Sequence, residues 1–210
     1  GGESLLLAAA ARVSSLRRRR EHRAEMAQVN AELVKLNEEL QVQARFDSLT
    51  GCRNRRYFLE EVGNEIKRAT RFAQPCALAM LDIDRFKEVN DRYGHATGDA
   101  LLKHFVQTVG GRLRASDFLG RLGGEEFALL MPQTDRRGAL EVAERIRGAV
   151  EAASAILADV ELRITVSIGV DAWRGADDHV ESLVARADAA MYQAKRDGRN
   201  RVRISDAPPA

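Results

Sequence analysis

Apolar and polar residues alternate along the first part of the chain with helical spacing. Residues 5 to 45 contain neither Gly nor Pro and are rich in Ala, Leu, Glu, Arg and Gln, which predicts one long helix. Apolar residues recur every three or four positions, at Met26, Val29, Leu33, Leu36 and Leu40. This is the a and d spacing of a coiled coil, and so narrow a stripe would stay exposed to water in a monomer. The pattern predicts a parallel dimer, with packing of the helix on its own domain as the alternative.

Helical and strand-like patterns alternate through the rest of the chain. We expect helices at residues 55–72, 100–109, 135–153 and 179–196, a short helix carrying Phe86 and Asn90, strands at residues 76–83, 162–170 and 201–204, and a β-hairpin at residues 118–132. The segment from Gly94 to Asp99 is expected to be a loop. Because the hairpin strands are neighbours in sequence, the sheet must be mixed or antiparallel, with helices packed over it. The predicted fold is α/β (α+β) and palm-like, with a mixed, mainly antiparallel sheet.

This pattern divides the chain into a coiled-coil helix at residues 1–45, a globular domain at residues 46–206 and a disordered tail at residues 207–210. A length of 210 residues, 45% of them hydrophobic and 30% charged, leaves room for one such domain and the helix. The net charge of +2 identifies no partner, and no nucleic acid partner is predicted. Cys52 and Cys76 lack CxxC spacing, so we expect no zinc site and a reducing, cytoplasmic location.

The N-terminal part of the helix bears on membrane attachment. A membrane span needs about 20 apolar residues, and the run from Leu5 to Ala11 is too short. It leads into the basic run from Arg17 to Arg20, an order that the cytoplasmic end of a truncated transmembrane helix would show. A linker helix between domains gives the same residues. Membrane contact is therefore predicted only through a region upstream of this chain, if at all.

The hairpin has a tip of two glycines followed by two glutamates, Gly123, Gly124, Glu125 and Glu126. Glycine permits a positive φ and leaves backbone amides open to phosphate oxygens. The neighbouring carboxylates can hold a divalent cation that neutralises the same phosphates. Such a tip is also common in ordinary turns, so it indicates nucleotide chemistry only together with other motifs.

A second acidic group ends the strand at residues 76–83, where ligand sites of α/β sheets usually lie. If this strand and the hairpin are neighbours, Asp82, the Ile83 carbonyl and Glu125 would form an oxygen cage for Mg²⁺. Two such ions, about 3.5 to 4 Å apart, activate a hydroxyl and stabilise a pyrophosphate leaving group. Asp84 is expected to cap the following helix instead.

Other polar residues suit a guanine nucleotide. The carboxylate of Asp99 can accept hydrogen bonds from N1–H and N2–H of guanine, and the amide of Asn90 can donate and accept at the base edge. Adenine offers a carboxylate no equivalent pair of donors. Lys87, Lys195 and Arg199 would supply positive charge for the outer phosphates.

In their order these motifs resemble the GGDEF family of diguanylate cyclases, over about residues 46 to 205. Residues 123–127 have the GGEEF form of the family signature. The other matches are Asp47 to Thr50 (DxLT), Asp82 to Lys87 (DIDxFK), Asn90, Gly94-His95, Gly98-Asp99, Val166 to Val170, Ala187-Asp188, Tyr192, Ala194-Lys195 and Gly198 to Asn200. The ordered set is far more specific than the hairpin alone.

The resemblance implies condensation of two GTP into cyclic di-GMP with release of two pyrophosphates, using Mg²⁺ or Mn²⁺, two ions per GTP. Each subunit of a homodimer would bind one GTP, and each 3′-hydroxyl would attack the partner's α-phosphate. By position, Asp82, the Ile83 carbonyl and Glu125 bind metal, Glu126 helps to activate the 3′-hydroxyl, Asn90 and Asp99 read guanine, and Phe86, Lys87, Gly123, Gly124, Lys195 and Arg199 hold phosphates.

The segment from Arg114 to Asp117 resembles the RxxD site through which the family's product inhibits the enzyme, and Arg145 is a second contributor. Arginine can form paired hydrogen bonds with guanine or phosphate, and aspartate can accept from guanine. The alternative is a surface ion pair.

Three other functions stay open. The domain would be a GTP or cyclic di-GMP receptor without activity, an inert module for dimerisation, or a cyclase that also accepts ATP. The intact Asp82, Glu125, Glu126 and Lys87 argue against the receptor. An inert module would not need guanine-reading and metal-binding residues together.

Overall fold

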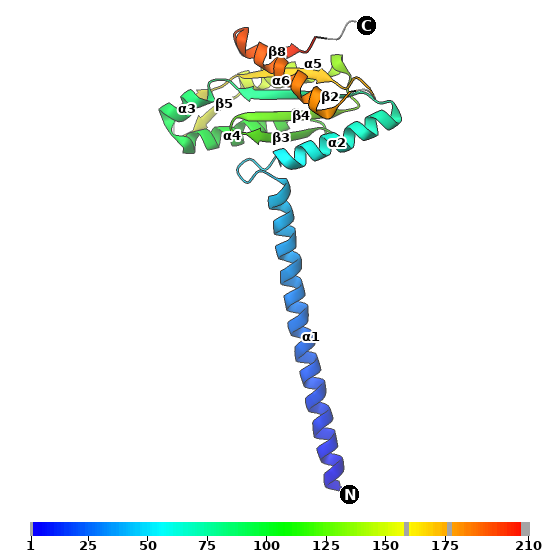
Figure 1. Cartoon of the computed structure of the whole chain (residues 1–210). Coiled ribbons are helices and arrows are strands. Elements are labelled where there is room, and N and C mark those ends of the chain that lie inside the picture. The colour runs from blue at the N-terminus through cyan, green and yellow to red at the C-terminus, as the bar shows by residue number, and fades with distance from the viewer. Residues whose placement is uncertain (1, 158–159, 176–177, 207–210) are drawn as a thin grey trace. The chain divides into compact units, whose positions relative to one another are not determined.

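The computed structural model describes residues 2–157, 160–175 and 178–206, so the predicted tail at residues 207–210 lies outside the described residues. The chain divides into two compact units, Gly1–Ala44 and Arg45–Ala210. Figure 1 shows the first as a single long helix and the second as a layered α/β domain. No helix among the described residues is both long and apolar enough to cross a membrane.

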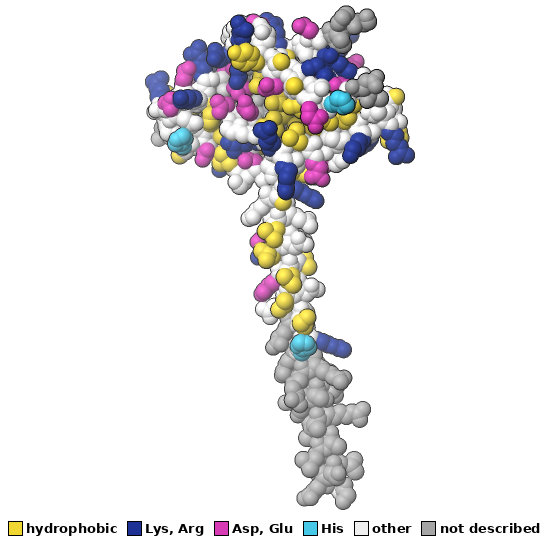
Figure 2. All heavy atoms as spheres, viewed as in Figure 1, with side chains coloured by type: hydrophobic (Ala, Val, Ile, Leu, Met, Phe, Trp, Pro, Cys, Tyr) yellow, Lys and Arg dark blue, Asp and Glu magenta, His cyan; other side chains and the backbone are white. Residues whose placement is uncertain are grey.

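The long helix α1 spans Gly2–Arg45, which confirms the predicted helix. Its apolar residues Met26, Val29, Leu33, Leu36 and Leu40 are each at least half exposed. Figure 2 shows apolar side chains along the described part of this helix.

The domain is built on a sheet of six strands in the order β1-β3-β4-β2-β7-β8. The strands are β1 (Arg53–Asn54), β2 (Cys76–Ile83), β3 (Phe118–Gly123), β4 (Glu126–Pro132), β7 (Val166–Ala172) and β8 (Val202–Ile204). The three central pairings, β3 with β4, β4 with β2 and β2 with β7, are antiparallel, and the two outer pairings are parallel. The prediction of a mixed, mainly antiparallel sheet is confirmed.

Helices cover both faces of this sheet. They are α2 (Arg55–Phe72), α3 (Phe86–Tyr93), α4 (His95–Gly110), α5 (Arg136–Ala152) and α6 (Val180–Arg196). Along β2, alternate residues enter different apolar cores: Ala79 and Leu81 pack with α4 and α5, whereas Leu78 and Met80 pack with α2 and α6. β2 is consequently buried on both faces, and its polar end is the natural place for a site.

Helix α6 packs directly on strand β7 at Gly169. A Cβ built on Gly169 would lie 2.0 Å from the backbone nitrogen of Met191, so any other residue would push the helix away. This close approach brings the C-terminal turn of α6 to the polar end of β2.

Two predicted boundaries are wrong. The segment from Gly94 to Asp99 is not a loop, because α4 already begins at His95. Gly94, with φ of 84°, separates α3 from α4, and the Thr97 hydroxyl donates to the Tyr93 carbonyl at 3.0 Å across the junction. The single glycine is enough to turn the chain between two helices, so no longer loop is needed.

The predicted strand at residues 162–170 is in fact two strands. Residues 160–163 form β6, which pairs with β5 (Ser154–Leu157) in a separate two-stranded sheet, and the central sheet resumes with β7 at Val166. The alternation of apolar residues continues across the break, because Leu162 of β6, Ile164 between the strands, and Val166 and Ile168 of β7 are all buried. Periodicity alone therefore did not reveal the break.

The expected helix cap at Asp84 is also wrong. The N-cap of α3 is Arg85, at a left-handed φ of 57°, with no side-chain cap hydrogen bond. Asp84 turns away from the helix and accepts hydrogen bonds from the hydroxyls of Thr165 and Ser167. Partners on a distant strand outcompete the local cap.

Candidate functional site

Three carboxylates lie at one end of the central sheet. β2 and β4 are antiparallel neighbours with Asp82 opposite Glu126, and the backbone nitrogen of Ile83 donates to the Glu125 carbonyl at 3.4 Å. The expectation that the first strand and the hairpin lie side by side is thus confirmed. Asp82 is buried, Glu125 is half-buried and Glu126 is exposed, so the group spans the edge from core to solvent.

The buried carboxylate carries the strongest electrostatic signal of the site. Asp82 is 5% exposed, and burial raises its pKa to about 6. The Lys195 ammonium, 2.7 Å from Asp82 Oδ2, opposes this rise in pKa, while the charges of Glu125 and Glu126 add to it. Two further carboxylates thus lie close enough to Asp82 to act on its charge, and such a concentration of negative charge favours a bound cation.

The donor set fits a hard divalent cation that is held jointly with a ligand. Among the described residues, no three acidic, His or Cys side chains are grouped so as to hold a metal by themselves. The available donors are carboxylate oxygens and the Ile83 carbonyl. Mg²⁺ and Mn²⁺ prefer oxygen donors, and Mg²⁺ typically combines one or two carboxylates with water and phosphate oxygens.

The glycine tip of the hairpin is open and firmly anchored. Gly124 has a left-handed φ of 49°, and nothing lies within 4 Å of a Cβ built on Gly123 or Gly124. Arg121 donates from Nε and from NH2 to the Gly124 carbonyl, at 3.0 and 2.8 Å, and from NH1 to Asp47 at 3.0 Å. The tip thus presents its backbone to solvent in a fixed shape. Arg121 was not among the predicted site residues, although it stands two positions before the glycines.

The predicted guanine residues lie on two adjacent helices. A Cβ built on Gly98 of α4 would lie 1.9 Å from Asn90 Oδ1 and 3.2 Å from the Phe86 ring, so glycine is required for α3 and α4 to approach. Asn90 Oδ1 is buried and has no hydrogen-bond partner in the described structure. A buried acceptor of this kind is costly unless a ligand supplies a donor. Asp99 is exposed on α4.

The predicted phosphate-binding residues come from the hairpin tip, α3, α6 and the segment after α6. Gly123 and Gly124 form the tip, Lys87 is exposed in the first turn of α3, and Lys195 contacts Asp82 from the last turn of α6. Arg199 follows α6 and is exposed, with a left-handed φ of 63°. Of this set, Lys195 is the one with an ion pair to the buried Asp82.

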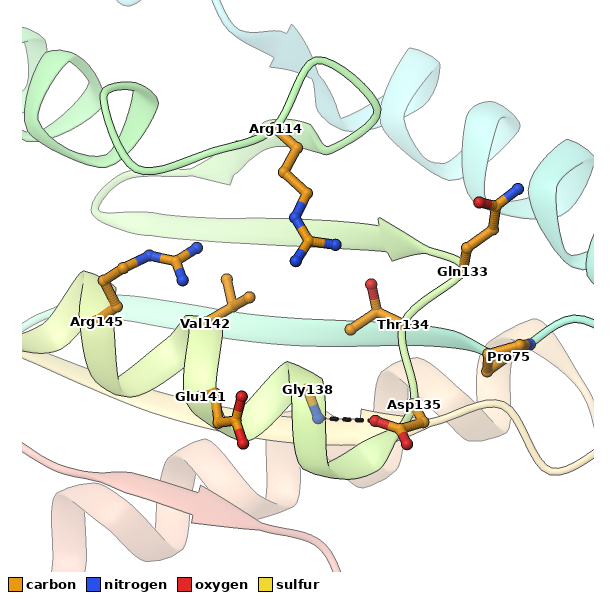
Figure 3. A pocket seen from close by; sticks show the side chains of 9 residues that line it. All are labelled: Pro75, Arg114, Gln133, Thr134, Asp135, Gly138, Glu141, Val142 and Arg145. Atoms are coloured by element: carbon orange, nitrogen blue, oxygen red, sulfur yellow. Dashed lines mark hydrogen bonds between the residues drawn. The ribbon is translucent and has the colours of Figure 1, made fainter.

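Arg114 and Arg145 line one cavity of about 350 Å³, although they are far apart in sequence. Figure 3 shows both guanidinium groups directed into it, Arg114 from the segment before β3 and Arg145 from α5. Asp117 does not line this cavity; its carboxylate accepts from the Arg114 backbone nitrogen at 2.8 Å and shapes the turn. The structure thus brings the two arginines together and gives the aspartate a supporting position.

Glu126 faces a different cavity, of about 660 Å³, between α2 and α6. Its lining includes Arg55, Leu59, Met80 and Glu181. The exposed carboxylate at the hairpin is consequently accessible from solvent on this side of the sheet.

The raised pKa of Asp82 predicts a pH dependence of stability. Folding raises this pKa from 3.8 to about 6, so the folded state holds the proton more tightly than the unfolded state. The stabilising contribution is full below about pH 4 and is lost as the pH rises through about 6. Two pKa units correspond to roughly 3 kcal/mol, and 1 kcal/mol shifts the Tm of a domain of this size by about 2 to 4 °C. In EDTA, the Tm of the parent relative to Asp82→Asn should therefore fall by roughly 6 to 12 °C across this range. A constant difference between the two melting curves would contradict the burial of Asp82.

Comparison with known proteins identifies the family of this chain. The model of the diguanylate cyclase GGDEF domain matches residues 44–201. The chain therefore belongs to the GGDEF family, whose domain is a diguanylate cyclase, a nucleotidyltransferase. The predicted family is confirmed.

Individual relatives agree. The response regulator PleD of Caulobacter vibrioides is 44% identical over 158 residues, covering 74% of this chain and 35% of PleD. Diguanylate cyclase DgcM of Escherichia coli is 41% identical over 171 residues, covering 81% of this chain and 41% of DgcM. The chain thus spans well under half the length of these two curated relatives.

A solved structure extends the likeness to both units. The coiled coil and GGDEF domain of DgcB from Caulobacter crescentus, in complex with c-di-GMP, superimposes with a TM-score of 0.79 at 33% identity. The match covers 87% of this chain and 98% of that one.

Proposed function

We propose that this chain condenses two GTP into cyclic di-GMP and releases two pyrophosphates. The observation that carries the proposal is the group of Asp82, Glu125 and Glu126 beside Lys195, at an open glycine tip. Family membership and relatives named as diguanylate cyclases support the same reaction.

Metal and phosphate binding follow from the charges at this edge. Asp82, the Ile83 carbonyl and Glu125 would hold Mg²⁺ or Mn²⁺, two ions per GTP. When bound, the metal neutralises the triphosphate and favours departure of pyrophosphate. With a cation held by Asp82, Lys195 would be available to bind the phosphates. The amides of the glycine tip, together with Phe86, Lys87 and Arg199, would orient the phosphates.

Guanine is read between α3 and α4. Asn90 Oδ1, buried without a partner, accepts a hydrogen bond from the base edge. Asp99 accepts from N1–H and N2–H, a pair of donors that adenine lacks. This arrangement favours GTP over ATP.

Bond formation requires two subunits. Each binds one GTP, and Glu126 takes the proton of a 3′-hydroxyl as its oxygen attacks the α-phosphorus of the partner's GTP. A new phosphodiester bond forms, the bond between the α-phosphorus and the bridging oxygen breaks, and pyrophosphate leaves. The exposed stripe of α1 supplies the contact between subunits as a parallel coiled coil.

The stoichiometry of pyrophosphate release tests this reaction. With Mg²⁺ and GTP, one pyrophosphate should appear for each GTP consumed, and ATP should give far less. Release of orthophosphate would indicate a GTPase and contradict the proposal.

We further propose that cyclic di-GMP inhibits the enzyme from the cavity containing Arg114 and Arg145. Two guanidinium groups pointing into one cavity suit guanine and phosphate. A complex of the DgcB domain with c-di-GMP is consistent with this ligand.

Arg114→Ala should relieve this inhibition, because it removes a forked donor from the cavity. The inhibitor concentration for half-maximal activity should rise about tenfold or more, and Arg145→Ala should act in the same direction. Arg137→Ala is the matched control. Arg137 is an exposed arginine on α5, the helix that carries Arg145, but it does not line the cavity. Equal inhibition of the parent and Arg114→Ala would refute the assigned site.

A further inference from the structure

The second carboxylate of the Asp82-Ile83-Asp84 motif has a different task from the first. Asp84 is 6% exposed, and its side chain accepts three hydrogen bonds from residues outside the hairpin. Oδ1 accepts from the Ser167 hydroxyl at 2.7 Å, and Oδ2 accepts from the Thr165 hydroxyl at 2.7 Å. Oδ2 also accepts from the backbone nitrogen of Asn200 at 3.0 Å. With these oxygens engaged by three donors, Asp84 is poorly placed to serve as a metal ligand.

The Asn200 amide belongs to a strained turn. Arg199 and Asn200 are consecutive non-glycine residues in the left-handed region, with φ of 63° and 45°. That conformation is unfavourable for residues with a side chain and persists only where surrounding contacts impose it. The contact from Asp84 is one of them. On the other side, the Asn200 side chain accepts from Arg147 at 3.0 Å and donates to Glu151 at 2.7 Å.

This turn lies next to the carboxylate site. Ser167, which binds Asp84, is the register partner of Asp82 on the neighbouring strand. The turn also follows directly on the last turn of α6, where Lys195 contacts Asp82. Asp84 therefore ties the loop after β2 to the segment carrying Lys195 and Arg199.

We propose that Asp84 is a positioning residue: it holds the strained turn so that Arg199 is presented to the triphosphate of GTP. This inference rests on the proposed function, in which Arg199 binds phosphate. Asp84 itself touches neither metal nor nucleotide.

The test compares affinities for GTP and guanosine by calorimetry with Mg²⁺ present. Asp84→Ala should weaken GTP binding about tenfold or more, because the Asn200 amide loses a charged acceptor. Guanosine affinity should change less than about twofold, since the guanine residues lie on α3 and α4. Asp84→Asn should restore GTP affinity, because its carbonyl can face the Asn200 amide while its NH₂ donates to the Ser167 hydroxyl, which can also accept.

A double variant shows whether Asp84 acts through Arg199. In an Arg199→Ala background, Asp84→Ala should have little further effect on GTP affinity. Asp171→Asn is the matched control. Asp171, like Asp84, is a buried carboxylate, but it forms an ion pair with Arg186 and lies opposite Leu78, towards the other end of the sheet. It should leave the ratio of GTP to guanosine affinity unchanged.

Each outcome decides the inference. The inference is overturned if Asp84→Ala leaves GTP affinity unchanged, or if the losses of GTP affinity in Asp84→Ala and Arg199→Ala add fully in the double variant. Either result leaves the proposed function intact. A parent that binds neither GTP nor guanosine overturns both. If Asp84→Ala does not fold, Asp84→Ser, whose hydroxyl is too short to reach the amide, takes its place. Hydrogen exchange of the Asn200 amide in the parent gives an independent check. Slow exchange is expected, because the amide donates to the buried Asp84. Exchange at the rate of an unprotected loop amide would contradict this contact.

Discussion

Replacing Glu126 by Gln should lower the rate of cyclic di-GMP formation by about 100- to 10,000-fold. The amide cannot accept the proton of the 3′-hydroxyl, whereas its size and hydrogen-bonding geometry stay close to those of the carboxylate. Binding of GTP should therefore change little, and the loss should appear in kcat rather than in KM. Steady-state rates together with calorimetric titration of GTP measure both quantities.

Glu181→Gln is the matched control for this variant. Glu181 is exposed and lines the same cavity as Glu126, but it stands on α6 rather than on the hairpin. It should retain nearly full activity. If Glu126→Gln kept the parental rate, or if both variants lost activity equally, Glu126 would not be the base.

Insertions into the stalk should change activity with a helical period. Each residue added between Leu40 and Phe46 rotates the two domains by about 100° relative to the coiled coil. The two GTP molecules must face each other for attack, and even small misplacements of reacting groups can cost about 100-fold. Insertions of two or five residues, about 160° and 140° out of phase, should thus lower the rate strongly. An insertion of four, about 40° out of phase, should lower it less, and an insertion of seven, about 20° out of phase, should largely restore it.

The insertion series is read as rate against number of residues, with dimerisation followed by light scattering. The dimer should persist in every variant, because the stripe from Met26 to Leu40 is unchanged. If activity did not depend on insertion length, the idea that α1 sets the relative rotation of the two domains would be refuted. If the parent protein were monomeric and fully active, the proposal that the reaction requires a dimer would be refuted.

Local patterns predicted most of the secondary structure. Residues 5 to 45 contain no Gly or Pro, and they form α1 as predicted. Asp135 caps α5 by accepting a hydrogen bond from the Gly138 nitrogen at 2.8 Å. The predictions failed where an element is too short to show a periodic pattern. β1 has two residues, and its pairing with β3 leaves no trace in periodicity. Leu162 of β6 is buried and in alternation with Ile164, Val166 and Ile168, which hid the break between β6 and β7.

The sequence predicted which strand ends meet at the site but not all the contacts between them. Asp82 and the hairpin could be paired by assuming that their strands are neighbours, which is correct. The ion pair between Lys195 and Asp82 depends on how closely α6 packs at Gly169, a tertiary feature without a local signal. Asp84 shows the same limit, because its hydroxyl partners on a distant strand replaced the expected cap.

The most direct test of the account is the identity of the product made from GTP. Freshly purified protein, cleared of bound nucleotide, is incubated with GTP and Mg²⁺, and the products are separated by chromatography and weighed by mass spectrometry. The account predicts cyclic di-GMP from the parent and almost none from Glu126→Gln. A product other than cyclic di-GMP, or none from a parent shown to be dimeric and to bind GTP, would contradict it.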